Sequence, residues 1–224
     1  MINIAIDGPA GSGKSTIAKA VAGRLGIRYM DTGAMYRGIA YTLVKAGISA
    51  SDVPEVIDSI NRTDLKVEYD EEGQHIIVDG EDVNGFLRTP EVTKMSSDSA
   101  VIPEVREKLV AIQQETAKRY DIVMDGRDIG TVVMPDAPLK VFMTASPRVR
   151  ALRRKLENDE KGIPCDLDQL EAEIIARDHT DSTRKTSPLK QADDAVFLDT
   201  SYMTIEEVVD FVIDKVNKVF NTDV

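Results

Sequence analysis

A run of glycine, lysine and hydroxyl residues near the start of the chain has the composition of a phosphate-binding loop. The run reads Gly8, Pro9, Ala10, Gly11, Ser12, Gly13, Lys14, Ser15 and Thr16. Its glycines permit backbone conformations that a Cβ would resist, so successive N–H groups can converge on phosphate oxygens. Lys14 adds a mobile positive charge, and the Ser15 hydroxyl can bind Mg²⁺. The spacing G-x-x-x-x-G-K-[ST] therefore predicts a loop that holds phosphates beside a magnesium ion.

The elements that must position this loop are also visible in the sequence. Residues 2–6 are mostly apolar, as expected of a short buried strand, and Ile17, Val21 and Leu25 share one face of a helix predicted after the loop. Strand, loop and helix in this order are what the motif requires. A glycine-rich turn without a ligand is the weaker interpretation.

Composition restricts the class of protein. The chain has 224 residues and a formal net charge of -11, which argues against nucleic acid as a partner because such binding depends on basic surfaces. Its single cysteine, Cys165, excludes an internal disulfide and a cysteine-rich zinc site, and suits a reducing compartment. Because residues 1–6 run directly into the phosphate loop, we expect no leader peptide, and no apolar run is long enough to span a membrane. We expect a cytoplasmic monomer with no membrane partner.

Short apolar runs alternate with longer segments of helical period. The predicted strands cover residues 2–6, 29–30, 122–124, 139–143 and 195–198, and the predicted helices cover residues 34–46, 104–118, 147–160, 167–177 and 205–219. Strands that alternate with helices pair in parallel through right-handed crossovers. The pattern predicts an α/β fold with a doubly wound parallel sheet that binds ligands at its carboxyl edge, where the phosphate loop lies.

Two stretches break this rhythm. Residues 65–69 alternate with period two, residues 70–74 are turn-rich, and residues 75–78 resume as a strand, which predicts a small antiparallel insert. About forty residues bury too little surface to form a separate domain, so the insert is an excursion from the core. Residues 158–166 read as a mobile loop between two helices, suited to a lid.

Several arginines stand beside predicted strand ends or in the suspected lid: Arg37, Arg106, Arg127, Arg153, Arg154, Arg177 and Arg184. A single arginine in an acidic protein is usually a solvated surface charge. Residues 31–37 and 125–130, however, each follow a predicted strand and therefore face the same crevice as the phosphate loop. Because the guanidinium fork binds phosphate bidentately, such a group suits a reaction with phosphates on both sides.

At these residues the chain resembles the bacterial cytidylate kinases. They are nucleoside monophosphate kinases that transfer the γ-phosphoryl group of ATP to CMP or dCMP, a step of pyrimidine nucleotide metabolism. The resemblance extends over nearly the whole chain and rests on residues 8–16, 31–37, 80–83, 105–107, 125–133, 135–138, 177–178 and 188–189. The run Asp-Gly-Arg-Asp-Ile-Gly-Thr-Val-Val at residues 125–133 is the most diagnostic. The resemblance implies a single P-loop kinase domain over residues 1–224 with a five-stranded sheet, a monophosphate-binding insert at residues 62–98 and a helical lid at residues 148–168.

The resemblance also implies roles for individual residues. It places Ser97, Arg106 and Asp128 around cytosine, whose amino donor and ring-nitrogen acceptor they can read. Uracil inverts both groups and would leave buried partners unpaired, at a cost of about 1–3 kcal/mol each. The acceptor phosphate is expected at Arg37, Arg127 and Arg184, with Tyr36 and Thr32 lining the pocket. Arg177 and Asp181 are implied at the sugar hydroxyls.

The chemistry implied by the resemblance needs no general base. The second pKa of a phosphate monoester lies near 6, so CMP already offers an anionic oxygen at neutral pH. Catalysis requires in-line positioning and charge compensation, for which the resemblance implies Lys14, Arg127, Arg153 and Arg184 together with Mg²⁺. Lid closure would carry Arg153, with Arg150 and Arg154 as further candidates, onto the phosphates. Asp125 either orients a water on Mg²⁺ or caps the following turn.

Two alternatives remain at this stage. Another small-molecule P-loop kinase would share the loop and the sheet, but not the insert or the run at residues 125–133. A nucleotide-dependent switch of GTPase type would need a guanine-reading Asn-Lys-x-Asp after a strand. Asn217 and Lys218 are followed by Val219 and Phe220, and they lie in a predicted terminal helix.

Overall fold

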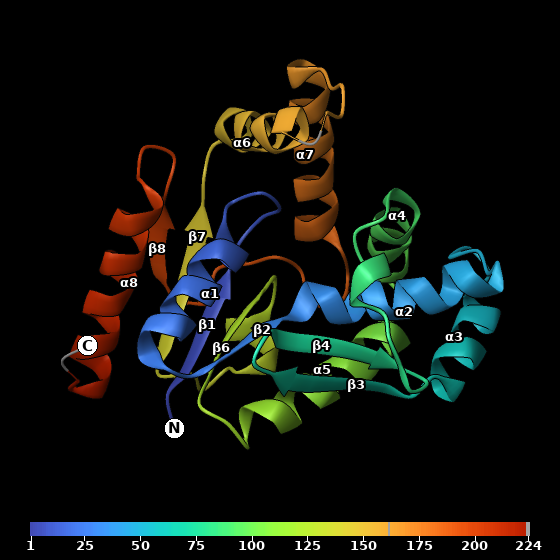
Figure 1. Cartoon of the computed structure of the whole chain (residues 1–224), viewed down its shortest axis with the longest axis horizontal. Coiled ribbons are helices and arrows are strands. Elements are labelled where there is room, and N and C mark those ends of the chain that lie inside the picture. Colours follow the sequence, from blue (N-terminus) through green and yellow to red (C-terminus); the bar gives the residue numbers. More distant parts are fainter. Residues whose placement is uncertain (161, 223–224) are drawn as a thin grey trace. The chain divides into compact units, whose positions relative to one another are not determined.

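The computed structural model describes residues 1–160 and 162–222, and the chain divides into two compact units (Figure 1). The first unit consists of Met1–Arg28 and Tyr120–Val224, and the second of Tyr29–Arg119. The insert expected at residues 62–98 lies within the second unit, and the lid expected at residues 148–168 lies within the first. Among the described residues, no helix combines the length and the apolar character needed to cross a membrane.

A parallel sheet forms the core of the first unit. Its strands are β1 (Asn3–Asp7), β6 (Ile122–Gly126), β7 (Leu139–Thr144) and β8 (Val196–Asp199), with β2 (Arg28–Asp31) completing the order β2-β6-β1-β7-β8. β1 pairs in parallel with β6 on one side and β7 on the other, and β8 pairs in parallel with β7. The five-stranded, doubly wound sheet predicted from the sequence is confirmed. Its register brings Asp7 opposite Gly126 and Ile6 opposite Asp125, so the chemistry-bearing ends of β1 and β6 coincide.

Two helices pack against this sheet and help to bury the apolar residues of its central strands. α1 (Lys14–Leu25) contacts β6 and α8 (Ile205–Phe220), and α8 also contacts β7. Ile4 and Ile6 in β1 are fully buried, and Val21 of α1 and Val212 of α8 contribute to the same core. Strands buried on both faces need continuous apolar runs rather than alternation.

α6 (Pro147–Glu160) and α7 (Leu167–Thr183) pack side by side (Figure 1). Ala151, Leu170 and Ile174 form a small apolar cluster between them, with Cys165 and Leu167 against it. The sequence predicted a loop over residues 158–166 and a helix ending at residue 177. α6 ends at Glu160, as predicted, whereas α7 continues to Thr183, which places the predicted sugar-binding Arg177 and Asp181 on α7. Of the predicted loop, Lys161 lies outside the described residues.

The second unit contains the antiparallel insert. β3 (Leu65–Asp70) pairs with β4 (Gly73–Val78), and β4 with the short β5 (Glu81–Asp82), which confirms the predicted hairpin. α2 (Thr32–Ala46) packs against this sheet. A Cβ on Gly38 of α2 would lie 2.8 Å from Ile76 Cγ2, so the close packing of helix on sheet depends on this glycine.

Further helices belong to the second unit. A 3₁₀ turn (Asn84–Phe86) leads to α4 (Pro90–Ser99) and α5 (Pro103–Ala117), and α3 (Val53–Arg62) precedes β3. Neither α3 nor α4 was predicted from the sequence. Both carry a start signal that was available: Asp52 and Thr89 cap the helices through their side chains, and a proline stands in the first two helical positions of each.

Candidate functional site

The phosphate loop has the backbone that its glycines predict. Gly8, Gly11 and Gly13 have φ of 152°, 72° and 87°, values that side chains with a Cβ rarely adopt. A Cβ on Gly8 would lie 1.9 Å from the carbonyl oxygen of Met143, so no other residue fits there. α1 begins directly after Gly13, which has no side chain to cap it. The first N–H groups of α1 are therefore suited to bind an anion.

Lys14 is buried against the inner face of the loop. Its Nζ donates to the carbonyl oxygen of Pro9 at 2.8 Å and lies 3.5 Å from Ser12 Oγ. Burial, followed by the charge of Arg127, lowers the pKa of Lys14 to about 7, and the carboxylates of Asp125, Asp7 and Asp181 act in the opposite direction. A bound polyphosphate would favour the charged form of this lysine.

Ser15 and Asp125 bring two oxygen ligands together. Ser15 Oγ donates to Asp125 Oδ2 at 3.0 Å across 110 residues of sequence, and Asp125 is buried in β6. A hydroxyl and a carboxylate beside a phosphate loop are the hard oxygen donors that Mg²⁺ prefers. Within the described chain, no group of three or more histidine, cysteine or acidic residues could hold a metal by itself. The pair thus suits an ion that takes its remaining ligands from phosphate and water.

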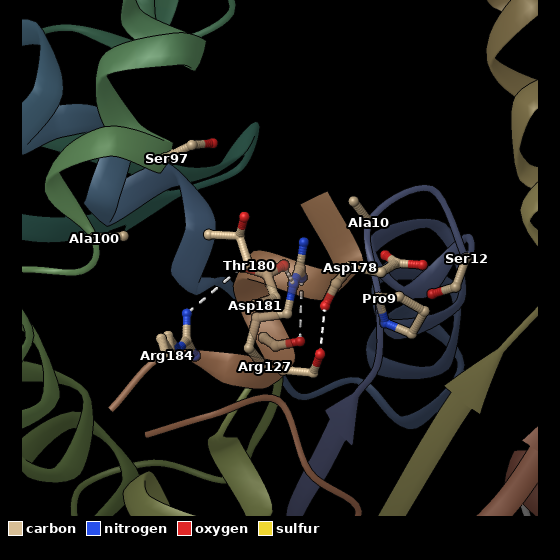
Figure 2. Close-up of polar contacts among 12 residues, drawn as sticks. Pro9, Ala10, Ser12, Ser97, Ala100, Arg127, Asp178, Thr180, Asp181 and Arg184 are labelled. Atoms are coloured by element: carbon tan, nitrogen blue, oxygen red, sulfur yellow. Dashed lines mark hydrogen bonds and ion pairs between the residues drawn. The ribbon is translucent and has the colours of Figure 1, made fainter. Parts of the chain in front are cut away.

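Asp181 joins two arginines of the predicted site. Its carboxylate accepts from Arg127 Nε at 2.9 Å and lies 3.7 Å from Arg184 Nη1 (Figure 2). Burial raises the pKa of Asp181, but the charges of Arg127, Arg177 and Arg184 outweigh it and the net shift is downward. The structure therefore brings Arg127, Asp181 and Arg184 together. Asp181, which was expected at the sugar hydroxyls, contacts two of the arginines expected at the acceptor phosphate.

Arg150 and Arg153 of α6 already reach the phosphate loop. Arg150 is buried and donates to the carbonyl oxygens of Ala145 at 2.8 Å and Ala10 at 3.0 Å, and its fork pairs with both oxygens of Asp178. Arg153 donates to the carbonyl oxygen of Thr200 at 2.7 Å and more weakly to that of Ser12 at 3.4 Å. Arg154, the third candidate for lid closure, is exposed. Arg150 thus connects α6 to α7 and to the phosphate loop.

Asp7 was not singled out from the sequence. It ends β1, is 5% exposed, and accepts the N–H groups of Ile129 and Gly130 at 2.8 Å and 2.7 Å. Burial raises its pKa to about 6, the two N–H groups oppose that shift, and the neighbouring charges of Asp128 and Lys14 contribute in opposite directions. A carboxylate directly before the first glycine of the loop was the available signal.

Asp128 lies in the sequence between Arg127 and Ile129, the residue whose N–H group Asp7 accepts. It is 4% exposed, and its carbonyl oxygen accepts the N–H groups of Val132 and Val133 at 2.9 Å and 3.2 Å. Residues Ile129–Val133 form a π-helical turn, a rare conformation that is frequent at functional sites. Part of the run at residues 125–133, the most diagnostic for the resemblance, thus also has an unusual backbone conformation.

The second unit positions Arg37. Its Nη2 donates to Asp31 Oδ2 at 2.7 Å, and Asp31 also caps α2 by accepting the N–H of Ala34 at 2.9 Å. The buried Nε of Arg37 has no hydrogen-bond partner within the part of the chain that the structure describes. Gln74 of the insert holds the main chain of Asp31 on both sides, accepting its N–H at 2.7 Å and donating to its carbonyl oxygen at 3.1 Å.

The remaining predicted residues of this unit lie on three helices. Arg106 of α5 is 2% exposed, and its guanidinium carbon lies 5.2 Å from the ring centre of Tyr36 in α2. Thr32 is the buried first residue of α2. Ser97 of α4 is half-buried, and its hydroxyl is 3.5 Å from the carbonyl oxygen of Thr93. The structure therefore brings Tyr36 and Arg106 together across 70 residues of sequence, a juxtaposition that spacing alone could not predict.

Comparison with known proteins identifies sequence relatives along almost the full length. The family model described as cytidylate kinase matches residues 4–218. The cytidylate kinase of Caldicellulosiruptor saccharolyticus is 48% identical over 223 residues, which is 100% of this chain and 99% of that protein. The cytidylate kinase of Streptococcus suis is 49% identical over 221 residues, 98% of each chain.

Solved structures extend the comparison to the fold. A gluconokinase from Sinorhizobium meliloti is 15% identical, with a TM-score of 0.52 over 98% of this chain and 94% of that one. An uncharacterized protein from Eubacterium ventriosum gives the same TM-score of 0.52 at 12% identity, over 97% and 99% of the two chains. At these identities the similarity concerns the fold alone.

Proposed function

The chain belongs to the cytidylate kinase family and transfers the γ-phosphoryl group of ATP to CMP or dCMP, and we propose that it does so in line, with the residue roles set out below. The full-length match to cytidylate kinases carries the activity. The two alternatives, a kinase of another small molecule and a GTPase-type switch, lack such support. The chain works as one P-loop kinase domain over residues 1–224, with a monophosphate-binding insert at residues 62–98 and a lid at residues 148–168.

In this proposal the donor is ATP and its phosphates occupy the loop from Gly8 to Thr16. The open N-terminus of α1 and the buried Nζ of Lys14 support the assignment, since both would compensate anionic oxygens. Mg²⁺ would be held by Ser15 Oγ and by Asp125, directly or through water. When bound, the ion supplies charge compensation between the β- and γ-phosphates.

The acceptor base is assigned to Ser97, Arg106 and Asp128. Arg106 is buried and carries fixed donors, and Asp128 is a buried carboxylate that can accept from an exocyclic amino group. Uracil would present a carbonyl oxygen to that carboxylate and lose the contact. Specificity for cytosine then follows from the cost of leaving buried polar groups unpaired.

The acceptor phosphate and sugar are assigned to the remaining residues. Arg37, Arg127 and Arg184 bind the phosphate, Tyr36 and Thr32 line the pocket, and Arg177 and Asp181 bind the sugar hydroxyls. The unpartnered Nε of Arg37 supports its part, because a buried donor of this kind has a phosphate oxygen as its natural acceptor. Asp181 currently pairs with Arg127 and Arg184, so substrate would enter an existing network of charges.

Catalysis is assigned to Lys14, Arg127, Arg153 and Arg184. The transferred phosphoryl group spreads negative charge over its oxygens, and these cations compensate it without any proton transfer by the protein. Arg153 would exchange its present carbonyl partners for phosphate when the lid closes. Closure would also exclude water that could hydrolyse ATP.

A coupled assay of phosphoryl transfer with Mg-ATP across CMP, dCMP, UMP and AMP tests the substrate assignment. CMP and dCMP should be used with much higher kcat/KM than UMP or AMP. Equal use of all four monophosphates would contradict it. We also propose a cytoplasmic location, which the free Cys165 supports. We further propose that the protein is a monomer, which light scattering after size exclusion tests.

A further inference from the structure

Asp7 is a buried carboxylate that the reaction outlined above does not use. Its Oδ1 accepts the N–H of Ile129 at 2.8 Å and its Oδ2 accepts the N–H of Gly130 at 2.7 Å. These contacts join β1 to the segment after β6 across more than 120 residues of sequence. Because each oxygen already holds one N–H group, Asp7 is equipped to fix the main chain rather than to bind a substrate.

The segment that Asp7 holds has little room for adjustment. A Cβ on Gly130 would lie 3.1 Å from Lys140 Cδ and 3.3 Å from Asp7 Oδ2. Lys140 is itself buried, and its Nζ donates to both oxygens of Asp194 at 2.9 Å and 2.7 Å. The main chain at Gly130 is therefore enclosed between a fixed lysine stem and the Asp7 carboxylate.

The residues next to this contact in the sequence are assigned to the two substrates, ATP and CMP. Gly8, which follows Asp7, opens the phosphate loop, and Asp128 directly precedes the bonded Ile129. We propose that Asp7 is a positioning residue of this kinase: by holding the main chain of Ile129 and Gly130, it sets the orientation of Asp128 toward the acceptor base. The inference rests on the assignment of Asp128 to cytosine made under Proposed function.

Asp7→Asn tests the inference. An amide keeps one acceptor oxygen but turns an NH₂ donor toward the second N–H group, so one of the two contacts is lost. KM for CMP should rise by about tenfold and the preference for CMP over UMP should fall by a similar factor, as expected for one charge-assisted hydrogen bond. KM for ATP should stay within about threefold of wild type. Initial rates with each substrate varied in turn give these values.

Two further variants make the test specific. In Asp121→Asn the same chemical change is made at the opposite end of β1, where Asp121 Oδ1 accepts the N–H of Ile2 at 2.7 Å, and KM for CMP should not change. Gly130→Ala strains the Asp7 contact from the other side and should reproduce the CMP-selective defect. If Asp7→Asn does not fold, Gly130→Ala carries the test.

A purely structural role for Asp7 would lower the melting temperature and leave the KM for CMP and the CMP preference of the folded variant unchanged, and this result would overturn the inference. Equal increases in KM for ATP and CMP would overturn it as well. Asp128→Ala separates the inference from its premise. If Asp128→Ala loses CMP selectively and Asp7→Asn does not, the base assignment stands and the positioning role is wrong. If Asp128→Ala affects CMP and UMP equally, both fail.

Discussion

At the residue scale, the phosphate loop holds a lysine whose charge depends on its ligand. The free chain buries Lys14 beside Arg127, which lowers its pKa to about 7. ATP would bring several negative charges to the same place and favour protonation. Binding of ATP is therefore linked to the uptake of a proton at any pH above that value.

This linkage gives the first prediction. At about pH 8, ATP binding should take up close to one proton, and the dissociation constant of ATP should rise by up to about tenfold for each pH unit above about 7. Calorimetry in two buffers of different ionisation enthalpy measures the uptake. Lys14→Arg should bind ATP without proton uptake because arginine stays charged. Identical heats in the two buffers for wild type would contradict the prediction.

A second prediction at this scale concerns Arg37. Arg37→Ala should raise KM for CMP by about ten to a hundredfold, because a charge-assisted contact to phosphate is lost, and should leave KM for ATP nearly unchanged. Arg37→Lys should recover little, since lysine lacks the planar fork held by Asp31. Arg62→Ala, at an exposed arginine of α3, is the matched control and should behave like wild type. Equal losses for ATP and CMP would assign Arg37 to the donor instead.

At the scale of elements, α6 and α7 are joined by more than their small apolar cluster. The guanidinium of Arg150 is almost fully buried and pairs with Asp178 of α7, while it also donates to the carbonyl oxygen of Ala10 in the phosphate loop. Removing one partner of a buried ion pair leaves the other charge without compensation. The helical pair and the loop therefore depend on the same contact.

Asp178→Ala should lower the free energy of unfolding by about 2 kcal/mol, since two hydrogen bonds to a buried charge are lost while the backbone partners of Arg150 remain. Arg148→Ala is the control: its ion pairs to Asp168 and Glu171 are exposed, and their loss should cost less than about 1 kcal/mol. Urea unfolding measures both. Equal losses in the two variants would show that the buried pair has no special weight.

The same elements should respond to ligands. CMP should slow hydrogen exchange in the insert, and ATP and CMP together should also slow it in residues 150–166, because the proposed lid closure would order that segment. Exchange followed by mass spectrometry, with each nucleotide alone as the comparison, resolves the two effects. Unchanged exchange of residues 150–166 in the ternary complex would contradict closure.

At the scale of the whole molecule, the site is maintained at a cost in stability. Asp7 has a folded-state pKa of about 6 against an ordinary value of 3.8, mainly because of its burial. Protonated Asp7 therefore stabilises the fold: this contribution is fully present below pH 3.8 and is lost as pH rises through about 6. A difference of this size corresponds to about 3 kcal/mol at neutral pH.

The unfolding free energy of wild type should accordingly rise relative to that of Asp7→Asn by about 2 kcal/mol between about pH 7 and about pH 4. Carboxylates whose pKa is lowered, such as Asp181, contribute less to the unfolding free energy as pH falls. Their contribution is the same in both proteins, so it cancels in the difference between them. Denaturant unfolding at a series of pH values measures the effect. A difference that does not vary with pH would contradict the raised pKa of Asp7.

Much of the architecture could be predicted because its signals are local. Apolar runs with helical separators indicated the strands of the parallel sheet, and alternation at residues 65–69, a turn-rich stretch and a second strand at residues 75–78 indicated the insert hairpin. α3 and α4 were missed although each has a start signal in its cap, Asp52 or Thr89, and a proline in its first turn, and although Val56 and Ile60 place apolar residues on one face of α3. The late end of α7 was missed because its last turns carry few apolar residues.

The sequence by itself determined the phosphate loop, because the conformations of Gly8, Gly11 and Gly13 and the start of α1 depend on residues within a few positions of one another. Only the tertiary structure decided which distant groups meet there. Ser15 contacts Asp125, and Asp7 contacts Gly130, because β1 and β6 pair in parallel in one particular register. A shift of that register by one residue would turn these side chains to the opposite face of the sheet. The register follows from packing over the whole first unit, which no local spacing encodes.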